Sequence, residues 1–143
     1  MIRHILVVCV GNICRSPMAE ALLQRELRGQ DGYTVESAGL GALVGHPASE
    51  YSVALMDELG LDISAHRARQ IHPDMVSAAD LVLVMEAGHR RVIDDADPTA
   101  RGKVHRLGDW QDIDIADPYR KEREAYEAAL RDIEKGVASW VEK

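Results

Sequence analysis

Two short apolar runs have the pattern of strands that are buried on both faces. They lie at residues 5–10 and 81–85, and they do not alternate with polar positions as a half-exposed strand would. Residues 33–36 and 104–107 are two shorter strand candidates. Continuous, mostly β-branched runs of this kind are typical of a parallel sheet that is covered on both sides.

Between these runs, hydrophobic residues recur every three or four positions, which predicts amphipathic helices. Ser16 and Pro17 suit the start of the first helix, because serine caps a helix and proline fits its first position. Gly29 is expected to end that helix. Further helices are predicted at residues 49–59, 88–94 and 122–141, and loops at residues 38–45 and 108–117.

The alternation of strands and helices predicts an open α/β sheet with helices on both faces. No repeat, linker or low-complexity segment divides the chain. Its length, 143 residues, is that of one domain. We therefore expect residues 1–143 to form a single α/β domain.

Charge and composition exclude several functions. The chain carries 17 basic and 24 acidic residues, a net charge of −7, which argues against nucleic acid as a partner. No apolar run reaches the roughly 18 residues of a membrane span, and the first run lacks the features of a signal peptide. We expect a cytoplasmic protein that does not insert into membranes. Its two cysteines are too few for a disulfide scaffold or a four-thiolate zinc site, and they should be reduced.

The segment from Cys9 to Ser16 joins the first strand to the first helix, where open α/β sheets bind ligands. A helix N-terminus offers free N–H groups and a positive dipole to an oxyanion. Gly11 is expected to let the backbone curl around the anion, and Arg15 adds a planar fork for two phosphate oxygens. Cys9 would lie at the floor of this phosphate loop, where the positive field favours the nucleophilic thiolate.

The alternative is a buried, inert Cys9 with Arg15 solvated on a helix. A Cys-x5-Arg pattern alone matches by chance in many chains, but its place between a buried strand and a helix start is more specific. A phosphoester reaction also needs an acid for the leaving oxygen. The acidic loop offers Asp117 in front of Pro118 and Tyr119, or else Asp117 only caps the last helix. The other carboxylates of that loop are Asp109, Asp112 and Asp114.

Four motifs in this order resemble the low molecular weight protein tyrosine phosphatases. They are residues 9–17, 36–39, 64–70 and 117–119, and the likeness covers nearly the whole chain. The resemblance implies a four-stranded parallel sheet with the phosphate loop between its first strand and first helix. It implies no cofactor. No metal is expected either, because the other histidines lack metal-ligand spacing.

The resemblance also implies roles for individual residues. Cys9 matches the nucleophile that forms a phosphocysteine intermediate, Arg15 the phosphate clamp and Asp117 the general acid. Ser16 matches a hydroxyl that supports the Cys9 thiolate. The remaining expected members of the site are the loop residues Val10, Gly11, Asn12, Ile13 and Cys14, and the residues Ser37 and His66, which with Asn12 would hold the loop in shape.

Two positions are expected to shape the substrate pocket. Tyr119 would form one apolar wall, and Leu43 stands where family members often carry an aromatic residue. Leu43 either lines the pocket or packs inward. Residues 35–45 and 117–121 resemble the bacterial branch associated with exopolysaccharide production. In that branch the partner is the tyrosine-rich tail of an autophosphorylating kinase. The protein is expected to be a monomer or a weak dimer.

Three other functions remain. A protein-arginine phosphatase of this family would tend to carry threonine at the position of Ile13, whose apolar side chain favours phosphotyrosine. A non-catalytic phosphate-binding module would need neither Cys9 nor Asp117. A thiol sensor would use Cys9 and Cys14 as a redox pair, in addition to catalysis. In the family the second cysteine resembles a protective disulfide partner, or else Cys14 only packs. An arsenate reductase relay is excluded, because no cysteine follows Cys14.

Overall fold

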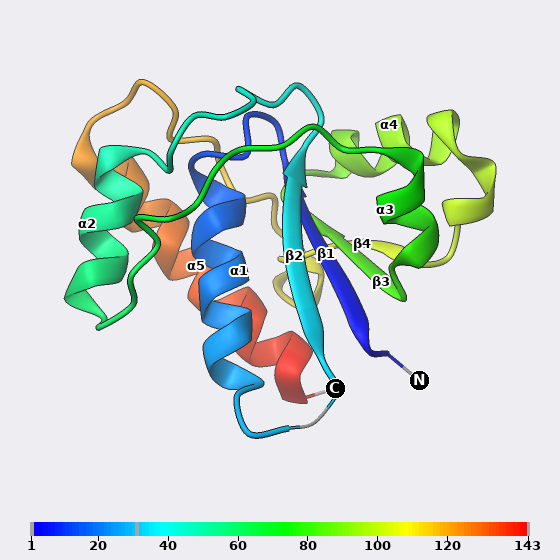
Figure 1. Ribbon diagram of the computed structural model, residues 1–143, viewed down its shortest axis with the longest axis horizontal. Helices are drawn as coiled ribbons and strands as arrows, with labels where there is room; N and C mark the ends of the chain where they lie inside the picture. The colour runs from blue at the N-terminus through cyan, green and yellow to red at the C-terminus, as the bar shows by residue number, and fades with distance from the viewer. Residues whose placement is uncertain (1, 31, 143) are drawn as a thin grey trace.

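The computed structural model describes residues 2–30 and 32–142. Four parallel strands form one sheet in the order β2-β1-β3-β4 (Figure 1), so the predicted four-stranded parallel sheet is confirmed. The strands are β1 (His4–Cys9), β2 (Thr34–Gly39), β3 (Leu81–Val84) and β4 (Val104–Arg106).

Helices cover both faces of the sheet, as the alternating pattern predicts (Figure 1). One face carries α1 (Arg15–Glu26), α2 (Glu50–Glu58) and α5 (Arg123–Glu142), and the other carries α3 (Pro73–Ala78) and α4 (Ala87–Ala96). Two short 3-10 turns, Pro98–Ala100 and Asp109–Gln111, flank β4.

The strands separate two apolar cores. In β1, Val7 and Cys9 face the core under α1 and α5, while Leu6 and Val8 face the core under α3 and α4. None of these four side chains is more than 2% exposed. Burial on both faces explains why the strand sequence is continuously apolar rather than alternating.

The sequence prediction was wrong on one loop and missed one helix. β2 continues to Gly39, whereas residues 38–45 were predicted to form a loop. Glycine is needed at position 39, because a Cβ there would collide with the carbonyl oxygen of Val10. The helix α3 was missed because it has only six residues, of which Val76 alone is buried.

Two helix starts also differ from the prediction. The helix α1 begins at Arg15, and Cys14 occupies the N-cap position without a side-chain capping bond, so Ser16 is inside the helix rather than its cap. The helix α5 begins at Arg123, so Asp117 does not cap it. Both differences free a polar side chain, Ser16 or Asp117, from a capping role.

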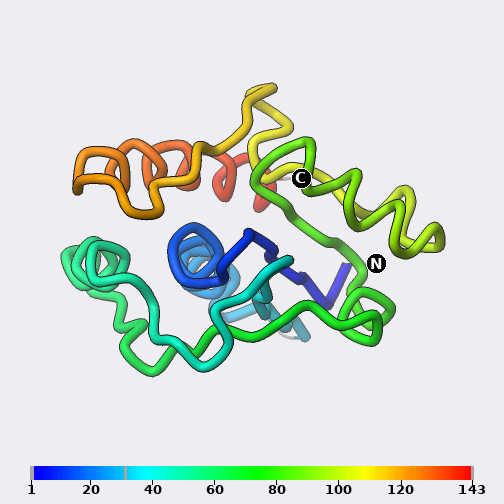
Figure 2. Tube along the Cα trace, turned by 90° about the horizontal axis from the view of Figure 1, so that it is seen from above, coloured from blue at the N-terminus to red at the C-terminus, as the bar shows by residue number. Residues whose placement is uncertain are grey.

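All carboxyl ends of the strands lie at one edge of the sheet, because the strands are parallel. Figure 2 looks down on this edge, where the loop between β1 and α1 lies near the middle. The strand order places β1 between β2 and β3, so the loops that follow all three strands meet there. No helix in the described ranges, 2–30 and 32–142, is long and apolar enough to cross a membrane.

Candidate active site

Residues 9–15 form the predicted phosphate loop, which turns from the end of β1 into the start of α1. The left-handed residue of this loop is Asn12, with φ of 60°, whereas the φ of Gly11 is not positive. Asparagine tolerates this conformation better than most residues because its short side chain can form local hydrogen bonds. The curl of the loop therefore depends on Asn12.

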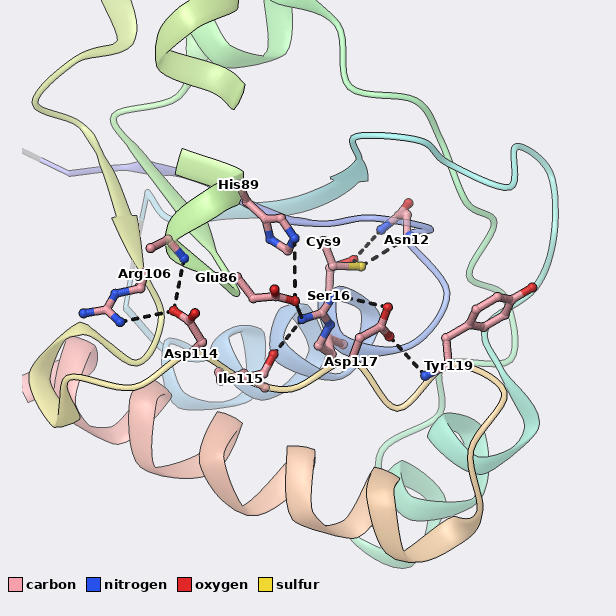
Figure 3. Close-up of polar contacts among 12 residues, drawn as sticks. Cys9, Asn12, Ser16, Glu86, His89, Arg106, Asp114, Ile115, Asp117 and Tyr119 are labelled. Atoms are coloured by element: carbon pink, nitrogen blue, oxygen red, sulfur yellow. Dashed lines mark hydrogen bonds and ion pairs between the residues drawn. The ribbon is translucent and has the colours of Figure 1, made fainter. Parts of the chain in front are cut away.

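Cys9 lies at the base of this loop and is 2% exposed. Its sulfur is 2.9 Å from the Ser16 hydroxyl oxygen, and the backbone N–H of Asn12 donates to it over 3.3 Å (Figure 3). Both groups can donate a hydrogen bond to a negatively charged sulfur. The loop therefore places two hydrogen-bond donors at the reactive atom of Cys9.

Asn12 is fixed by the residues that the resemblance placed around it. Its amide nitrogen donates to the hydroxyl oxygens of Ser16, over 2.7 Å, and Ser37, over 3.0 Å. The carbonyl oxygen of Asn12 accepts from the Nε2 atom of His66 over 2.7 Å, and its side-chain oxygen accepts from the backbone N–H of Arg69. The position of Arg69 in this network was not predicted from the sequence.

Arg15 is 1% exposed and is held along one side of its guanidinium. Nη1 donates to Glu86 Oε2 over 2.7 Å and to the carbonyl oxygen of Ile115 over 2.6 Å (Figure 3). Nε is buried without a hydrogen-bond partner among the described residues. The edge formed by Nε and Nη2 is therefore left to bind two oxygens of one phosphate group.

Glu86 is a site residue that sequence reasoning missed. It comes two residues after β3, at the carboxyl end of a buried strand, and that position is the signal that could have found it. His89 lies 3.7 Å from the Glu86 carboxylate, and its Nδ1 atom is buried without a partner in the part of the chain that the structure describes. Burial lowers the pKa of His89 below its usual value of 6.5, while the Glu86 charge raises it.

Asp117 is the carboxylate of the acidic loop that reaches the phosphate loop. Its Oδ2 atom is 3.6 Å from Arg15 Nη2, and its Oδ1 atom accepts from the backbone N–H of Tyr119 (Figure 3). The carboxylate is 42% exposed, so it can exchange protons with water. The three other candidates instead pair with Arg106; they are Asp109, Asp112 and Asp114.

A cavity of about 110 Å³ opens above Cys9. Leu43 lines it and also packs against the larger core, so both positions considered for that residue apply in part. Together with Ile13 and Tyr119 it provides apolar walls, and Arg15 and Asp117 provide the charges. Val10, Gly11, Cys14 and Gly41 complete the lining.

Cys14 follows the predicted nucleophile in the same loop, and its side chain contacts the last helix. Its sulfur is 3.4 Å from the hydroxyl of Tyr126, which also accepts a hydrogen bond from Ser49. Burial raises the pKa of Cys14 to about 11 and that of Tyr126 to about 12. Cys9 and Cys14 are both free thiols. Among the described residues, no cluster of three or more metal-ligating side chains is found.

A loop that curls at the end of a central parallel strand, with a cysteine at its base and a buried arginine beside it, defines a cysteine-dependent phosphatase. The chain belongs to the low molecular weight phosphotyrosine protein phosphatase family, whose model matches residues 4–143. This membership confirms the family that the four motifs indicated, and its members are cysteine-dependent hydrolases.

One similar protein is "Probable low molecular weight protein-tyrosine-phosphatase EpsP" of Ralstonia nicotianae. It is 52% identical over 141 residues, which cover 99% of this chain and 95% of that protein. Among solved structures, Vibrio vulnificus Wzb in complex with benzylphosphonate has a TM-score of 0.93 and 39% identity, over 99% of both chains. The bacterial branch predicted from the sequence is thereby confirmed.

A third similar protein has a different named activity. The YwlE arginine phosphatase from Geobacillus stearothermophilus has a TM-score of 0.90 and 36% identity, over 98% of this chain and 91% of its own. The fold alone therefore does not separate the two substrate classes, and the pocket residues have to.

Proposed function

We propose that this low molecular weight protein tyrosine phosphatase hydrolyses phosphotyrosine through a phosphocysteine intermediate formed on Cys9. The observation that carries the proposal is that Cys9, Arg15 and Asp117 surround one cavity although Asp117 is more than 100 positions away in sequence. A nucleophile, an oxyanion clamp and an acid are the three groups that the reaction needs. We further propose that residues 1–143 act as one domain.

In the first step, the Cys9 sulfur attacks phosphorus while the Nε and Nη2 edge of Arg15 binds the equatorial oxygens. The S–P bond forms, the bond from phosphorus to the tyrosyl oxygen breaks, and Asp117 gives its proton to that oxygen. In the second step, Asp117 takes a proton from water, whose oxygen attacks phosphorus. The S–P bond breaks, and Cys9 leaves as a thiolate that receives the Ser16 hydrogen bond.

The pocket favours phosphotyrosine over phosphoarginine. Ile13, Leu43 and Tyr119 present apolar surface to an aromatic ring, and the pocket lining has one carboxylate, Asp117, for a guanidinium. Arginine phosphatase activity and plain phosphate binding are the alternatives. The benzylphosphonate bound to the similar Wzb is an aryl-like phosphonate, which supports the first choice for this chain.

We propose the tyrosine-rich tail of an autophosphorylated bacterial kinase as the partner. Val10 and Tyr119, both 40% exposed, lie beside the pocket opening, where a flexible peptide can contact them. Such a kinase tail is reached from the cytoplasm, so we place the protein there, as a monomer or a weak dimer, in the exopolysaccharide branch of the family.

The decisive experiment measures phosphate release from peptides with phosphotyrosine, phosphoarginine or phosphoserine, without metal. We expect turnover of phosphotyrosine and at least about tenfold less of the other two, a difference of about 1.4 kcal/mol in the barrier. The control is Cys9→Ser, which should fold, bind oxyanions and lose turnover by orders of magnitude. Preference for phosphoarginine, or near-normal activity of Cys9→Ser, would overturn the proposal.

A further inference from the structure

A continuous line of hydrogen bonds runs from Cys9 to Glu20 on α1. Ser16 Oγ is 2.9 Å from the Cys9 sulfur, and Asn12 Nδ2 is 2.7 Å from Ser16 Oγ. The same nitrogen is 3.0 Å from Ser37 Oγ, and Ser37 Oγ is 2.5 Å from Glu20 Oε1. None of the sequence motifs contains Glu20, and its sequence position predicts only a polar residue on the first helix.

The direction of each hydrogen bond in this line follows from the acceptor and donor atoms. Asn12 Oδ1 accepts from the backbone N–H of Arg69, so the opposite side of the amide must be the NH₂ group. An amide nitrogen only donates, and Ser16 and Ser37 therefore both accept from it. Each hydroxyl then has one O–H group left to donate. Ser16 donates a hydrogen bond to the Cys9 sulfur, and Ser37 donates one to Glu20.

A competing arrangement exists in which the Asn12 amide is turned over. Its oxygen would then face both hydroxyls and accept a hydrogen bond from each. Ser16 could then no longer donate a hydrogen bond to the Cys9 sulfur. Asn12 and Ser16 are 0% exposed and Ser37 is 3% exposed, so the partners of these side chains are chiefly other groups of the protein. Two groups oppose this arrangement: the backbone N–H of Arg69, which would face the amide NH₂, and Glu20, which accepts the hydrogen bond of Ser37.

We propose that Glu20 is a positioning residue, which fixes the direction of these hydrogen bonds so that Ser16 donates to Cys9. The inference rests on the proposed role of Cys9 as the nucleophile. Glu20 acts through Ser37 and Asn12 and does not touch the substrate. Gln24 holds the carboxylate in place, because its side-chain nitrogen is 3.4 Å from Glu20 Oε2.

A purely electrostatic role for Glu20 predicts the opposite effect. A carboxylate near a sulfur disfavours the thiolate, so removing its charge would make Cys9 more reactive at low pH. If Glu20 instead fixes the direction of the hydrogen bonds, Cys9 should become less reactive when the carboxylate of Glu20 is removed. The other charged residues that line the cavity beside Glu20 are Glu36, His66, Arg67 and Arg69, and they stay unchanged in the comparison.

The test measures the rate at which iodoacetamide alkylates Cys9 as a function of pH, without substrate. Mass spectrometry assigns the label to Cys9 rather than Cys14. In Glu20→Ala, we expect the pH of half-maximal reactivity to rise by about one unit, since a hydrogen bond to a charged group is lost. We also expect kcat for an aryl phosphate to fall about three- to tenfold while KM changes little.

Matched variants separate acceptor from charge. Glu20→Gln keeps an oxygen that can accept the hydrogen bond of Ser37, so its alkylation curve should match that of the wild type. Glu20→Asp keeps the charge but is one methylene shorter, so it should share the defect of Glu20→Ala. Glu26→Ala, on an exposed position of the same helix, should change nothing.

The strictest test removes the Ser37 hydroxyl, which donates a hydrogen bond to Glu20. In a Ser37→Ala background, Glu20→Ala should cause no further shift, a non-additivity expected of coupled residues. A lowered or unchanged pH of half-maximal reactivity in both Glu20→Ala and Glu20→Asp would overturn the inference. So would a full shift in the Ser37→Ala background. Failure of the wild type to release phosphate would instead count against the proposed function, since alkylation needs no turnover.

Discussion

At the scale of single residues, the guanidinium of Arg15 is fixed by its neighbours before any substrate binds. Glu86 and the Ile115 carbonyl both bind Nη1, so the side chain cannot rotate away from the loop when no substrate is bound. A clamp held in advance does not have to be ordered during the reaction, which is the condition for strong electrostatic stabilisation of a transition state.

Arg15→Lys tests this geometry. Lysine keeps the positive charge but loses the planar fork that matches two oxygens. We expect kcat to fall roughly 10²–10³-fold, as on removal of an oxyanion donor, with a smaller change in KM. Steady-state kinetics on an aryl phosphate provide both values. A loss confined to KM would mean that Arg15 only binds the ground state.

Asp117→Asn tests the source of the proton. A tyrosine hydroxyl has a pKa of about 10, so it leaves slowly as an anion, whereas a nitrophenolate leaves easily. The variant should therefore lose more rate on poor leaving groups than on good ones. The measurement is the rate of Cys9 phosphorylation, by rapid quench, across aryl phosphates of graded leaving-group pKa. Equal slopes in variant and wild type would exclude Asp117 as the acid.

Cys14→Ser tests the predicted protective disulfide. Peroxide converts the Cys9 thiolate to a sulfenic acid, and Cys14 would displace water from it to form the disulfide. Without Cys14, we expect unchanged activity of the reduced enzyme but poorer recovery by dithiothreitol after peroxide. Because burial raises the pKa of Cys14 to about 11, the protection should improve as pH rises. Equal recovery of variant and wild type would leave Cys14 as a packing residue.

At the scale of elements, α5 lies unusually close to the end of β4. A Cβ on Gly136 would be 2.6 Å from the Leu107 carbonyl oxygen and 2.9 Å from its Cγ atom. Trp140 of the same helix also contacts Leu107, because its Nε1 atom donates to the Leu107 carbonyl oxygen over 3.1 Å. The helix that follows the acid loop is therefore seated on backbone atoms.

Gly136→Ala should reduce the free energy of unfolding by about 1–3 kcal/mol, the usual cost of overpacking. Alanine stabilises a helix by about 1 kcal/mol relative to glycine. A loss of stability would therefore show that the collision with Leu107 outweighs the gain in helix propensity. The control is Gly88→Ala in α4, where an added Cβ meets nothing within 4 Å. Urea unfolding of both variants provides the comparison. Stabilisation by Gly136→Ala would contradict the close approach.

The elements that could be predicted from sequence have either a continuous apolar run or a strong apolar periodicity. β1 and β3 have the first, and α5 has the second. The six-residue α3 could not be found, since one buried side chain makes no pattern. In the site, Cys9 and Arg15 share one loop and were visible together. Glu86 and Glu20 were not, because their roles depend on which strands and helices become neighbours.

At the scale of the whole molecule, His89 links stability to pH. Burial lowers its pKa below 6.5, so the unfolded chain binds the proton more readily than the folded one. Protonation thus favours unfolding, and the contribution of His89 to stability decreases as pH falls through about 6.5.

We expect the difference in unfolding free energy between wild type and His89→Gln to shift in favour of the variant between pH 7.5 and 5.5. Urea unfolding should be done without phosphate or sulfate, because oxyanions that bind the folded loop also stabilise it. Parallel pH curves for the two proteins would exclude His89 from the linkage.

The contacts of Arg15 also have a consequence for synthesis on the ribosome. Arg15 is 71 positions from Glu86 and 100 positions from Ile115. A nascent chain exposes its thiol early, and the sheet has all its strands once Arg106 has been added. The Ile115 carbonyl that holds Arg15 and the acid Asp117 are added only afterwards. A chain that stops between residues 107 and 114 would therefore contain the nucleophile and all four strands but lack one contact of Arg15 and the acid, so catalysis has to wait until residue 117 has been added.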